Sequence, residues 1–331
     1  MDFFDGFGRY GSNSDILERG NDAFFWRDFV GNTPILTPGA GRNGGAAIHQ
    51  GILRGLFNTP RVTQAFGGAI KVGPGDPLKV QLMDSASSFA IQDQISFDAS
   101  TGAITVTSGS NTWSSPNNVI PPNTYFSYAA IFTIDASAGA FQIYVDLQLV
   151  SGLNQTGVST QTTGNADFDA ILLYPQFNDD YYTDFWTNPT LIGGDAFSVW
   201  VPPNGAGAST QFTPNPGSNA NWQNVDGLSG GSNDNASSTV GQSDLFTIPN
   251  TAVAGGTILA LEPGYQGSRD APGGRALATR VRSSSGLITN GTGFVLSSGR
   301  TIRGTVFNTD PATSSAWLAG SLPQVGYEVT S

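Results

Sequence analysis

The segment from Asn178 to Thr187, NDDYYTDFWT, holds the residue types with the clearest chemical potential in the chain. Paired carboxylates beside aromatic rings are what a sugar-cleaving site uses, and Asp oxygens at a loop can hold Ca²⁺. A half-buried strand with one wet face would show the same composition. The carboxylates are Asp179, Asp180 and Asp184, and the rings are Tyr181, Tyr182, Phe185 and Trp186.

Strand spacing argues against a catalytic pair in this segment. In a regular strand Asp180, Tyr182, Asp184 and Trp186 share one face, and the two carboxylates lie about 13 Å apart. At that distance they cannot cooperate without outside partners. We therefore predict a structural strand with its preceding turn, no catalytic residue and no cofactor-binding residue. Asp179 and Asp180 are weak candidates for a metal site, with Ca²⁺ as the possible cofactor.

Other motif matches lack the context that their chemistry needs. The sequence GAGRNG at 39–44 matches GxGxxG, but prolines interrupt the segment before it and no helix pattern follows. The sequence GLSGG at 227–231 matches GxSxG, but it lies in a Gly/Asn/Ser-rich stretch rather than at a strand-to-helix turn. His49 is the single histidine and cysteine is absent, which excludes the usual zinc sites and thiolate chemistry. These motifs predict glycine-rich turns and a protein that is not an enzyme.

The elements around these residues read as strands. Alternating and β-branched patterns cover 78–84, 94–100, 103–108, 124–135 and 140–150. The turn sequences DASTG (98–102) and DASAG (135–139) predict two hairpins. In 140–150 the alternation places Phe141, Ile143, Val145, Leu147 and Leu149 on one buried face. Asp310 and Pro311 predict a short helix over 312–319. The fold class is all-β: an antiparallel β-sandwich followed by a smaller β-rich domain with one short helix.

Charge restricts the partners. Residues 80–268 contain no Lys or Arg but 15 Asp and Glu residues, and the whole chain has a formal net charge of −11. An acidic body of this length repels phosphate backbones, so we do not expect a nucleic-acid partner. No basic leader with an apolar core and no apolar run of membrane-spanning length is present, which predicts a soluble protein without a membrane partner.

The order of several sequence pieces resembles one family. The pieces are FFDGFGRYG (3–11), GRNGGAAI (41–48), the two DAS-turn hairpins, DAILLY (169–174) with DDYYTDFWT, VWVPPNGAGASTQFTPNPGSNANWQNVD (199–226), STVGQSDLF (238–246) and NTDPATSSAWLAGSLPQVGYEV (308–329). Together they resemble bacteriophage virion structural proteins with an N-terminal concanavalin/laminin-G-like jelly roll and a smaller C-terminal β-domain. The resemblance covers nearly the whole chain.

Composition predicts a domain layout, and the resemblance implies a structural role. A stretch dense in Gly, Asn, Ser and Pro from about 202 to 241 is too long for a structureless loop within one domain and places a boundary near residue 208. We expect a jelly-roll domain over 1–208 and a C-terminal β-rich domain over 209–331, which an extended Gly/Asn/Ser-rich connection precedes. The expected function is a non-enzymatic component of a virion that decorates or cements the capsid or forms part of the tail. Expected partners are other virion proteins and further copies in a homo-oligomer, and assembly takes place in the host bacterial cytoplasm. The region from Arg269 to Arg303 could dock onto an acidic body.

Two alternatives remain open at this point. A glycan-binding adhesin, such as a tail fibre or host-receptor-binding module, would use exposed rings of Tyr181, Tyr182 or Trp186 as a stacking platform for a host-surface glycan. A polysaccharide depolymerase is the weaker alternative. Burial of those rings would count against the first alternative, and a reducing-end assay would test the second.

Overall fold

The computed structural model divides the chain into two compact units. It describes residues 3–5, 7, 16, 19–20, 24–42, 46–175, 179–192, 196, 201–215, 219–225, 234–249, 257–270 and 273–331. We call residues 2–8 with 23–198 the jelly-roll unit, and residues 1 and 9–22 with 199–331 the C-terminal unit. Strands dominate both units, which confirms the all-β fold class.

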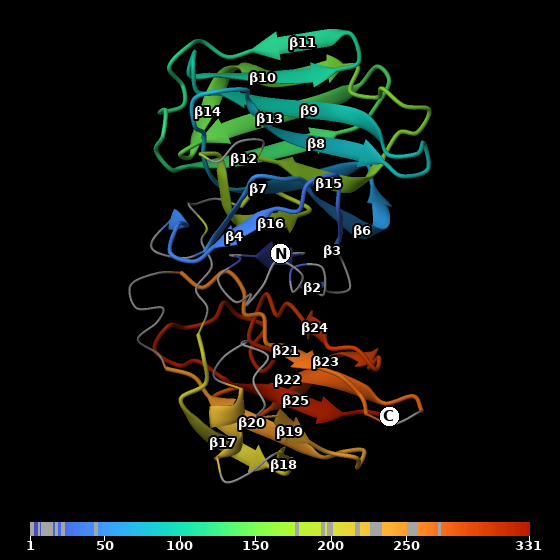
Figure 1. The fold of residues 1–331 in the computed structure, drawn as a ribbon, viewed down its shortest axis with the longest axis vertical. Coiled ribbons are helices and arrows are strands. Elements are labelled where there is room, and N and C mark those ends of the chain that lie inside the picture. The colour runs from blue at the N-terminus through green and yellow to red at the C-terminus, as the bar shows by residue number, and fades with distance from the viewer. Residues whose placement is uncertain are drawn as a thin grey trace. The chain divides into compact units, whose positions relative to one another are not determined.

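The jelly-roll unit is a sandwich of two largely antiparallel sheets, drawn as separate layers in Figure 1. The first sheet has β1 (Phe3–Asp5) paired with β16 and otherwise the order β14 (Gln148–Val158), β13 (Gly139–Val145), β12 (Phe126–Thr133), β7 (Thr63–Lys71), β16 (Tyr181–Asn188), β5 (Ala47–His49), β4 (Ile35–Thr37). The second has the order β11 (Asn111–Ser114), β10 (Ala103–Ser108), β9 (Ala90–Asp98), β8 (Leu78–Asp84), β15 (Phe168–Tyr174), β6 (Leu53–Arg61), β3 (Phe24–Phe29). This arrangement is a two-sheet, jelly-roll β-sandwich.

Aromatic rings fill the space between the two sheets. Phe132 stacks between Phe66 and Phe141, with ring centroids 6.0 and 5.5 Å apart. Tyr182 donates a 2.5 Å hydrogen bond to the Tyr128 hydroxyl, so two fully buried phenols satisfy one another. Large buried rings contribute most of the hydrophobic free energy in a core of this kind.

Both predicted DAS-turn hairpins are present. Asp98 closes the β9–β10 turn by accepting hydrogen bonds from Ser100 N (2.8 Å) and Thr101 Oγ1 (2.9 Å). Asp135 closes the β12–β13 turn by accepting from Ser137 N (2.8 Å) and Ala138 N (2.7 Å). The carboxylates therefore hold the turns locally, as Asx turns do.

The single strand predicted over 140–150 is wrong. The chain reverses at Asp146 and Leu147, whose φ values of 43° and 69° are left-handed, and β14 begins at Gln148. The Asp146 carboxylate accepts from Ser127 N at 2.9 Å, which fixes the turn against β12. As a result Leu147 and Leu149 are 53% and 43% exposed rather than buried.

A bulge in β9 ties a long loop to the second sheet. Leu82 pairs with Asp93 but Met83 pairs with Ile91, so Gln92 is the extra residue. The Gln92 amide nitrogen donates to the carbonyls of residues 165 and 167 at 2.6 and 2.9 Å, and its amide oxygen accepts from the backbone of residues 162 and 163 at 2.7 Å each. One side chain therefore holds the loop before β15 in place.

The residue after this bulge is a carboxylate in the core. Asp93 lies on the same face of β9 as Ile95 and Phe97, and none of its surface is exposed. Burial raises the pKa of the Asp93 carboxyl to about 7, and the Ser108 hydroxyl offsets part of the rise. The folded state is therefore most stable when the Asp93 carboxyl is protonated and neutral.

This burial predicts a pH-dependent stability. Between about pH 4 and pH 7 the folded state binds a proton at Asp93 that the unfolded state releases, so the free energy of unfolding falls by up to about 1.4 kcal/mol per pH unit as pH rises. Asp93→Asn should remove this slope and be more stable than the parent protein at pH 8. Denaturant unfolding of both proteins from pH 4 to 8 measures the difference. Parallel pH curves would contradict the prediction.

The C-terminal unit is built on a five-stranded antiparallel sheet with the order β17 (Gly205–Thr210), β20 (Ser243–Thr247), β25 (Gln324–Val329), β22 (Ala276–Arg282), β23 (Ile288–Val295). Beside it are the hairpin of β18 (Thr213–Asn215) and β19 (Asp234–Ala236), the 3-10 turn η2 (Asn221–Asn224), and β24 (Thr301–Gly304) between β2 (Arg19–Gly20) and β21 (Gly264–Gly267). The domain boundary at residue 208 stays a prediction; residue 208 itself lies in β17, which pairs with β20.

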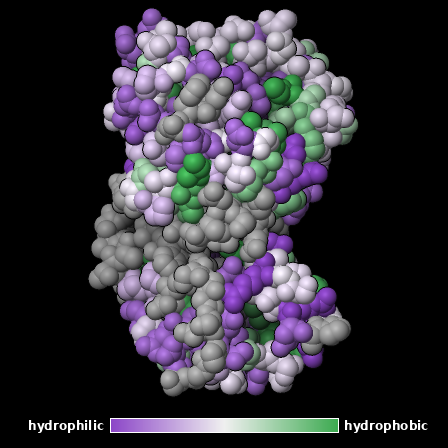
Figure 2. Space-filling model, in the orientation of Figure 1, coloured by the Kyte–Doolittle hydropathy of each residue, from purple (hydrophilic) through white to green (hydrophobic). Residues whose placement is uncertain are grey.

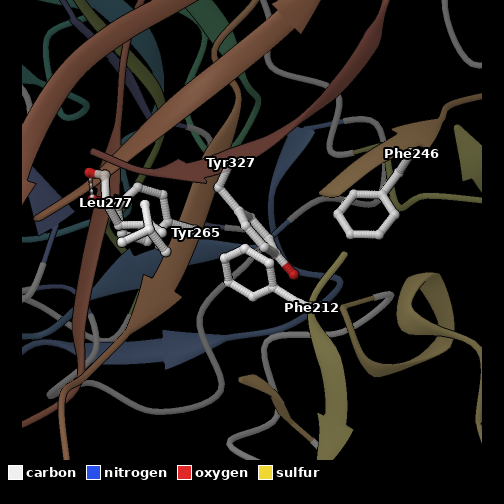
Figure 3. Packing of buried hydrophobic residues seen from close by; sticks show 6 residues of the cluster. Phe212, Phe246, Tyr265, Leu277 and Tyr327 are labelled. Carbon is white, nitrogen blue, oxygen red and sulfur yellow. Dashed lines mark hydrogen bonds between the residues drawn. The ribbon is translucent and has the colours of Figure 1, made fainter. Parts of the chain in front are cut away.

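An aromatic cluster forms the core of this unit. Figure 3 shows Tyr327 between Tyr265 and Phe246, with Phe212 against its ring. The Phe212 and Tyr327 ring centroids are 5.0 Å apart, and the Tyr265 hydroxyl donates to the Leu277 carbonyl at 2.6 Å. Buried phenols thus keep hydrogen-bond partners, which burial in an apolar core requires.

One further expectation for this unit is wrong. No helix forms over 312–319, because the chain closes a tight turn in which Ala312 N donates to the Asp310 carboxylate and Ser314 N to the Asp310 carbonyl, with Ser314 at φ 56°. Arg280, which lies in the region from Arg269 to Arg303, has partners within this unit. It pairs with Glu328 and donates to Ser243 Oγ and Asn290 Oδ1 at 2.8 Å each. Reversing its charge would disturb this unit itself.

Within the described residues no helix is long and apolar enough to cross a membrane.

Candidate functional site

The NDDYYTDFWT segment forms the turn before β16 and most of β16 itself. Asn178 lies outside the described residues, Asp179 is exposed in the turn, and Asp180 is completely buried. Asp180 Oδ1 accepts a 2.9 Å hydrogen bond from Gly73 N, which ties this turn to the loop after β7. The segment is therefore a central strand of the first sheet, and its alternation decides which rings reach the surface.

A bulge interrupts that alternation. Thr183 pairs with Ala69 and Trp186 with Gly67, so β16 advances three residues while β7 advances two. Asp184, at φ 55°, takes the left-handed conformation that Asp tolerates better than most residues. The prediction that Asp180, Tyr182, Asp184 and Trp186 share one face is therefore wrong beyond Thr183.

The bulge buries most of the aromatic platform expected from the sequence. Phe185 enters the core, 5.0 Å from the Trp26 ring. Tyr182 is fully buried, and Trp186 lies over Gly67 and is only 3% exposed. Of the three rings proposed as a stacking platform, only Tyr181 is accessible, and it is half-buried.

Tyr181 lies in a row of side chains from four adjacent strands. The Lys71 ammonium is 4.6 Å from its ring centroid, and the His49 ring is 5.0 Å away and tilted by 31°. His49 Nε2 and Thr37 Oγ1 are 2.9 Å apart, so the row continues from β7 through β16 and β5 to β4. We call Lys71, Tyr181, His49 and Thr37 the Tyr181 row.

The row borders an open hollow and a polar support. Ile35, which pairs with His49, lines a hollow of about 390 Å³ together with Asn32, Thr33, Gln50 and Gly51. On the other side, the Tyr125 hydroxyl donates to the Ala40 carbonyl at 2.6 Å. Burial raises the pKa of Tyr125, and nearby Tyr181 and Asp184 raise it further. Tyr125 is therefore a neutral hydrogen-bonding neighbour of the row.

The buried Asp184 is balanced by a cation. Its Oδ2 lies 3.4 Å from Arg42 Nε, and both side chains are largely buried, at 5% and 13% exposure. Arg42 also donates to the Ala196 carbonyl at 3.0 Å. The ion pair fixes the bulge, so Asp184 is a structural carboxylate and does not face a ligand.

The bulge predicts different effects for two substitutions at Asp184. Asp184→Val removes the partner of a buried Arg42 and places a β-branched residue at a left-handed φ, so we expect a loss of about 3–5 kcal/mol. Asp184→Asn tolerates this φ and keeps an oxygen for Arg42, and should retain at least about 2 kcal/mol more stability. Denaturant unfolding measures both variants. Equal losses would show that the bulge does not constrain this position.

The two weak metal candidates have different surroundings among the described residues. Asp179 and Asp180 are adjacent, but one is exposed and the other buried against Gly73 N. In the part of the chain that the structure describes, no group of three or more His, Cys, Asp or Glu residues could hold a metal. The Gly73 amide supplies Asp180 with a hydrogen-bond donor where a cation would otherwise be needed.

We therefore predict that stability is independent of Ca²⁺. The melting temperature should agree within about 1 °C in excess chelator and in millimolar Ca²⁺, because an ion that binds only the folded state would raise it. Differential scanning calorimetry makes the comparison. An increase of several degrees with Ca²⁺, abolished in Asp179→Asn, would establish a site at this turn.

The other motif matches lie only partly within the described residues. In the described part of 39–44, Gly39 and Ala40 follow β4 in a turn, as predicted. The GxSxG match at 227–231 lies outside the described residues. His49 lies 2.9 Å from the Thr37 hydroxyl and stacks near Tyr181, so it belongs to the Tyr181 row. Sequence reasoning missed this row because its members come from four strands that only the sheet order brings together.

Comparisons with known proteins give distant structural likenesses and no family. No protein-family model matches the chain, and no curated protein matches it. Three similar solved structures are the catalytic domain of a glycoside hydrolase family 131 protein from Coprinopsis cinerea, the carbohydrate-binding module CBM66 from Bacillus subtilis and a Lotus tetragonolobus seed lectin. Their identities are 14%, 16% and 8%, and their TM-scores 0.36, 0.31 and 0.34. The alignments cover 58%, 50% and 56% of this chain and 95%, 94% and 96% of those chains.

Proposed function

We propose that the jelly-roll unit binds glycans non-covalently through the Tyr181 row and the adjoining hollow. The observation that carries the proposal is the placement of one accessible aromatic ring between a lysine and a histidine, beside a hollow lined by amide and hydroxyl groups. A sugar ring offers an apolar face and a rim of hydroxyls, and it needs this combination of stacking surface and hydrogen-bonding groups.

The surroundings of the row suit a weak, reversible contact. The hollow is open and polar, lined by Asn32, Thr33 and Gln50 around the single apolar side chain of Ile35. The visible face of the jelly-roll unit in Figure 2 is mainly hydrophilic to neutral, with hydrophobic atoms in small separate areas. A hydroxyl-rich ligand can exchange its water for such groups at little cost. Repeated copies of a weak site would supply avidity.

The proposal includes binding without catalysis. Glycoside hydrolysis needs two carboxyl groups open to the substrate. Asp180 and Asp184 are the two buried carboxylates of the segment that contains Tyr181. Asp180 accepts a hydrogen bond from Gly73 N, and Asp184 pairs with Arg42, so neither is open to a substrate. A reducing-end assay on each bound polysaccharide tests this part of the proposal. Release of reducing ends by the purified wild-type chain would overturn it.

Tyr181→Ala should weaken glycan binding about tenfold or more while leaving the fold intact, because it removes the stacking surface from the outer face of the sheet. A glycan array with the whole chain identifies a ligand, and calorimetric titration compares the proteins. Tyr144→Ala is the matched control: Tyr144 is a half-buried tyrosine on β13 whose hydroxyl donates to Gln142 at 3.2 Å. Absence of any ligand on the array, or equal weakening by both variants, would count against the Tyr181 row.

A second candidate is a structural role on a bacteriophage particle. The supporting observation is the order of sequence pieces from FFDGFGRYG to the C-terminal QVGYEV, which resembles virion proteins. In that role the chain would assemble in the host bacterial cytoplasm and contact capsid or tail proteins as a decorating, cementing or tail component. A glycan-binding module displayed on a particle would combine the two candidates. Locating the chain in density of an intact virion tests this role independently of glycan binding.

A further inference from the structure

Strand β23 is an edge strand with unusually little protection. It has one described neighbour, β22, and ends the five-stranded sheet of the C-terminal unit (Figure 1). Its sequence, ITNGTGFV, contains no ionisable residue and no proline. The side chains at and beside its two ends are apolar and exposed: Leu287 is 48%, Ile288 44% and Val295 69% exposed. Natural edge strands usually carry charges or proline or stay short, because an open ladder of N–H and C=O groups pairs with other chains.

Other described sheet edges are shorter than β23, partly buried in the sandwich or built from small residues. The edge strands β4, β11 and β21 have only three or four residues each. The long edge strand β14 bends out of register, with Val150 and Leu153 buried in the sandwich. The opposite edge of the same sheet, β17, consists of Gly, Ala, Ser and Thr, and its register shifts against β20. β23 therefore stands out as the edge that can accept another strand.

β23 does contain a β-bulge, a feature that can protect an edge strand. Asn290 pairs with Arg280 and Gly293 with Ala278, so β23 contains one extra residue. A side chain at Gly291 would collide with Thr305 and Thr279, which explains why glycine occupies the bulge. The bulge leaves three paired residues on each side.

The bulge also makes the strand self-complementary. Ile288 and Val295 are seven residues apart and would lie on opposite faces of a regular strand. They pair with Arg282 and Ala276, which are six residues apart, so both lie on the same face. In an antiparallel pair of two β23 strands centred between Gly291 and Thr292, Ile288 of each copy faces Val295 of the other. Asn290 then faces Gly293 on that face, and Thr289 faces Phe294 on the opposite face.

We propose that β23 pairs with β23 of a second copy of this chain in that register, joining two five-stranded sheets into one across a two-fold axis. Each end of the joint places an apolar side chain against an apolar side chain, and such cross-strand pairs stabilise a sheet. The absence of charge on β23 removes like-charge repulsion between the copies. A two-fold joint uses the same edge of both copies and closes at two, whereas pairing β23 with β17 of another copy would continue as a fibre.

The oligomeric state and charged variants test the pairing. Sedimentation of the full chain over a range of concentrations should show a monomer–dimer equilibrium. Val295→Lys and Ile288→Lys should each raise the dimer dissociation constant about tenfold or more, because each places a charge at both ends of the joint. Leu318→Lys is the matched control, since Leu318 is also 69% exposed but lies outside β23. A wild-type chain that stays monomeric, or equal effects of all three variants, would overturn the proposal.

Cross-linking tests the register, and the absence of native cysteine makes it specific. Ile288→Cys mixed with Val295→Cys should form a disulfide-linked heterodimer on mild oxidation, because directly opposed side chains lie within disulfide reach. In the proposed register each variant alone should cross-link poorly. A dimer that cross-links more strongly in one variant alone than in the mixture would place the copies in another register and overturn the pairing stated above.

Discussion

The extra residue in β16 is the constraint on which the jelly-roll unit depends. It lets one strand place Tyr182 and Phe185 in the core although they are three residues apart, and it leaves Tyr181 and Trp186 on the opposite side. A regular strand would have sent one of the two core rings to the surface. The cost is a non-glycine residue at positive φ, which the buried Arg42–Asp184 pair offsets. The packing of the core and the exposure of Tyr181 are thus two results of one backbone irregularity.

Aspartate residues have different structural roles at the surface and in the interior of this chain. At the surface Asp98, Asp135 and Asp146 close turns with backbone N–H groups, and the hydrogen bonds of Asp98 and Asp135 lower their pKa values despite the opposing effect of burial at Asp98. In the interior Asp93 has no comparable donors and is stable in its neutral form. The acidic composition therefore reflects mainly how an all-β chain with many turns fixes its connections. Few of these acidic residues lie together in a candidate site.

Much of the fold follows from local sequence, and the site does not. The two DAS turns were predictable because an Asp side chain bonds to amides two or three residues away. The reversal at Asp146–Leu147 could not be predicted in this way. Two-residue turns with positive φ usually contain Asn-Gly or Asp-Gly, and this turn contains neither. The bulge in β16 depends on packing against β7, which strand periodicity cannot show. Among the aromatic residues of the segment, the sequence could therefore not distinguish accessible Tyr181 from buried Tyr182 and Trp186.

The clamp formed by Gln92 makes the path of a loop depend on a distant point in the sequence. Its amide bonds with main-chain atoms of residues 162, 163, 165 and 167. The loop adds side-chain contacts of its own, since the Thr163 hydroxyl and the Asn165 amide both donate to Asp84 Oδ2 at 2.8 Å. A change at position 92 would release four main-chain groups at once, whereas a change at position 163 or 165 would remove one of these two donors to Asp84. The loop therefore depends most on a residue some seventy positions earlier in the chain.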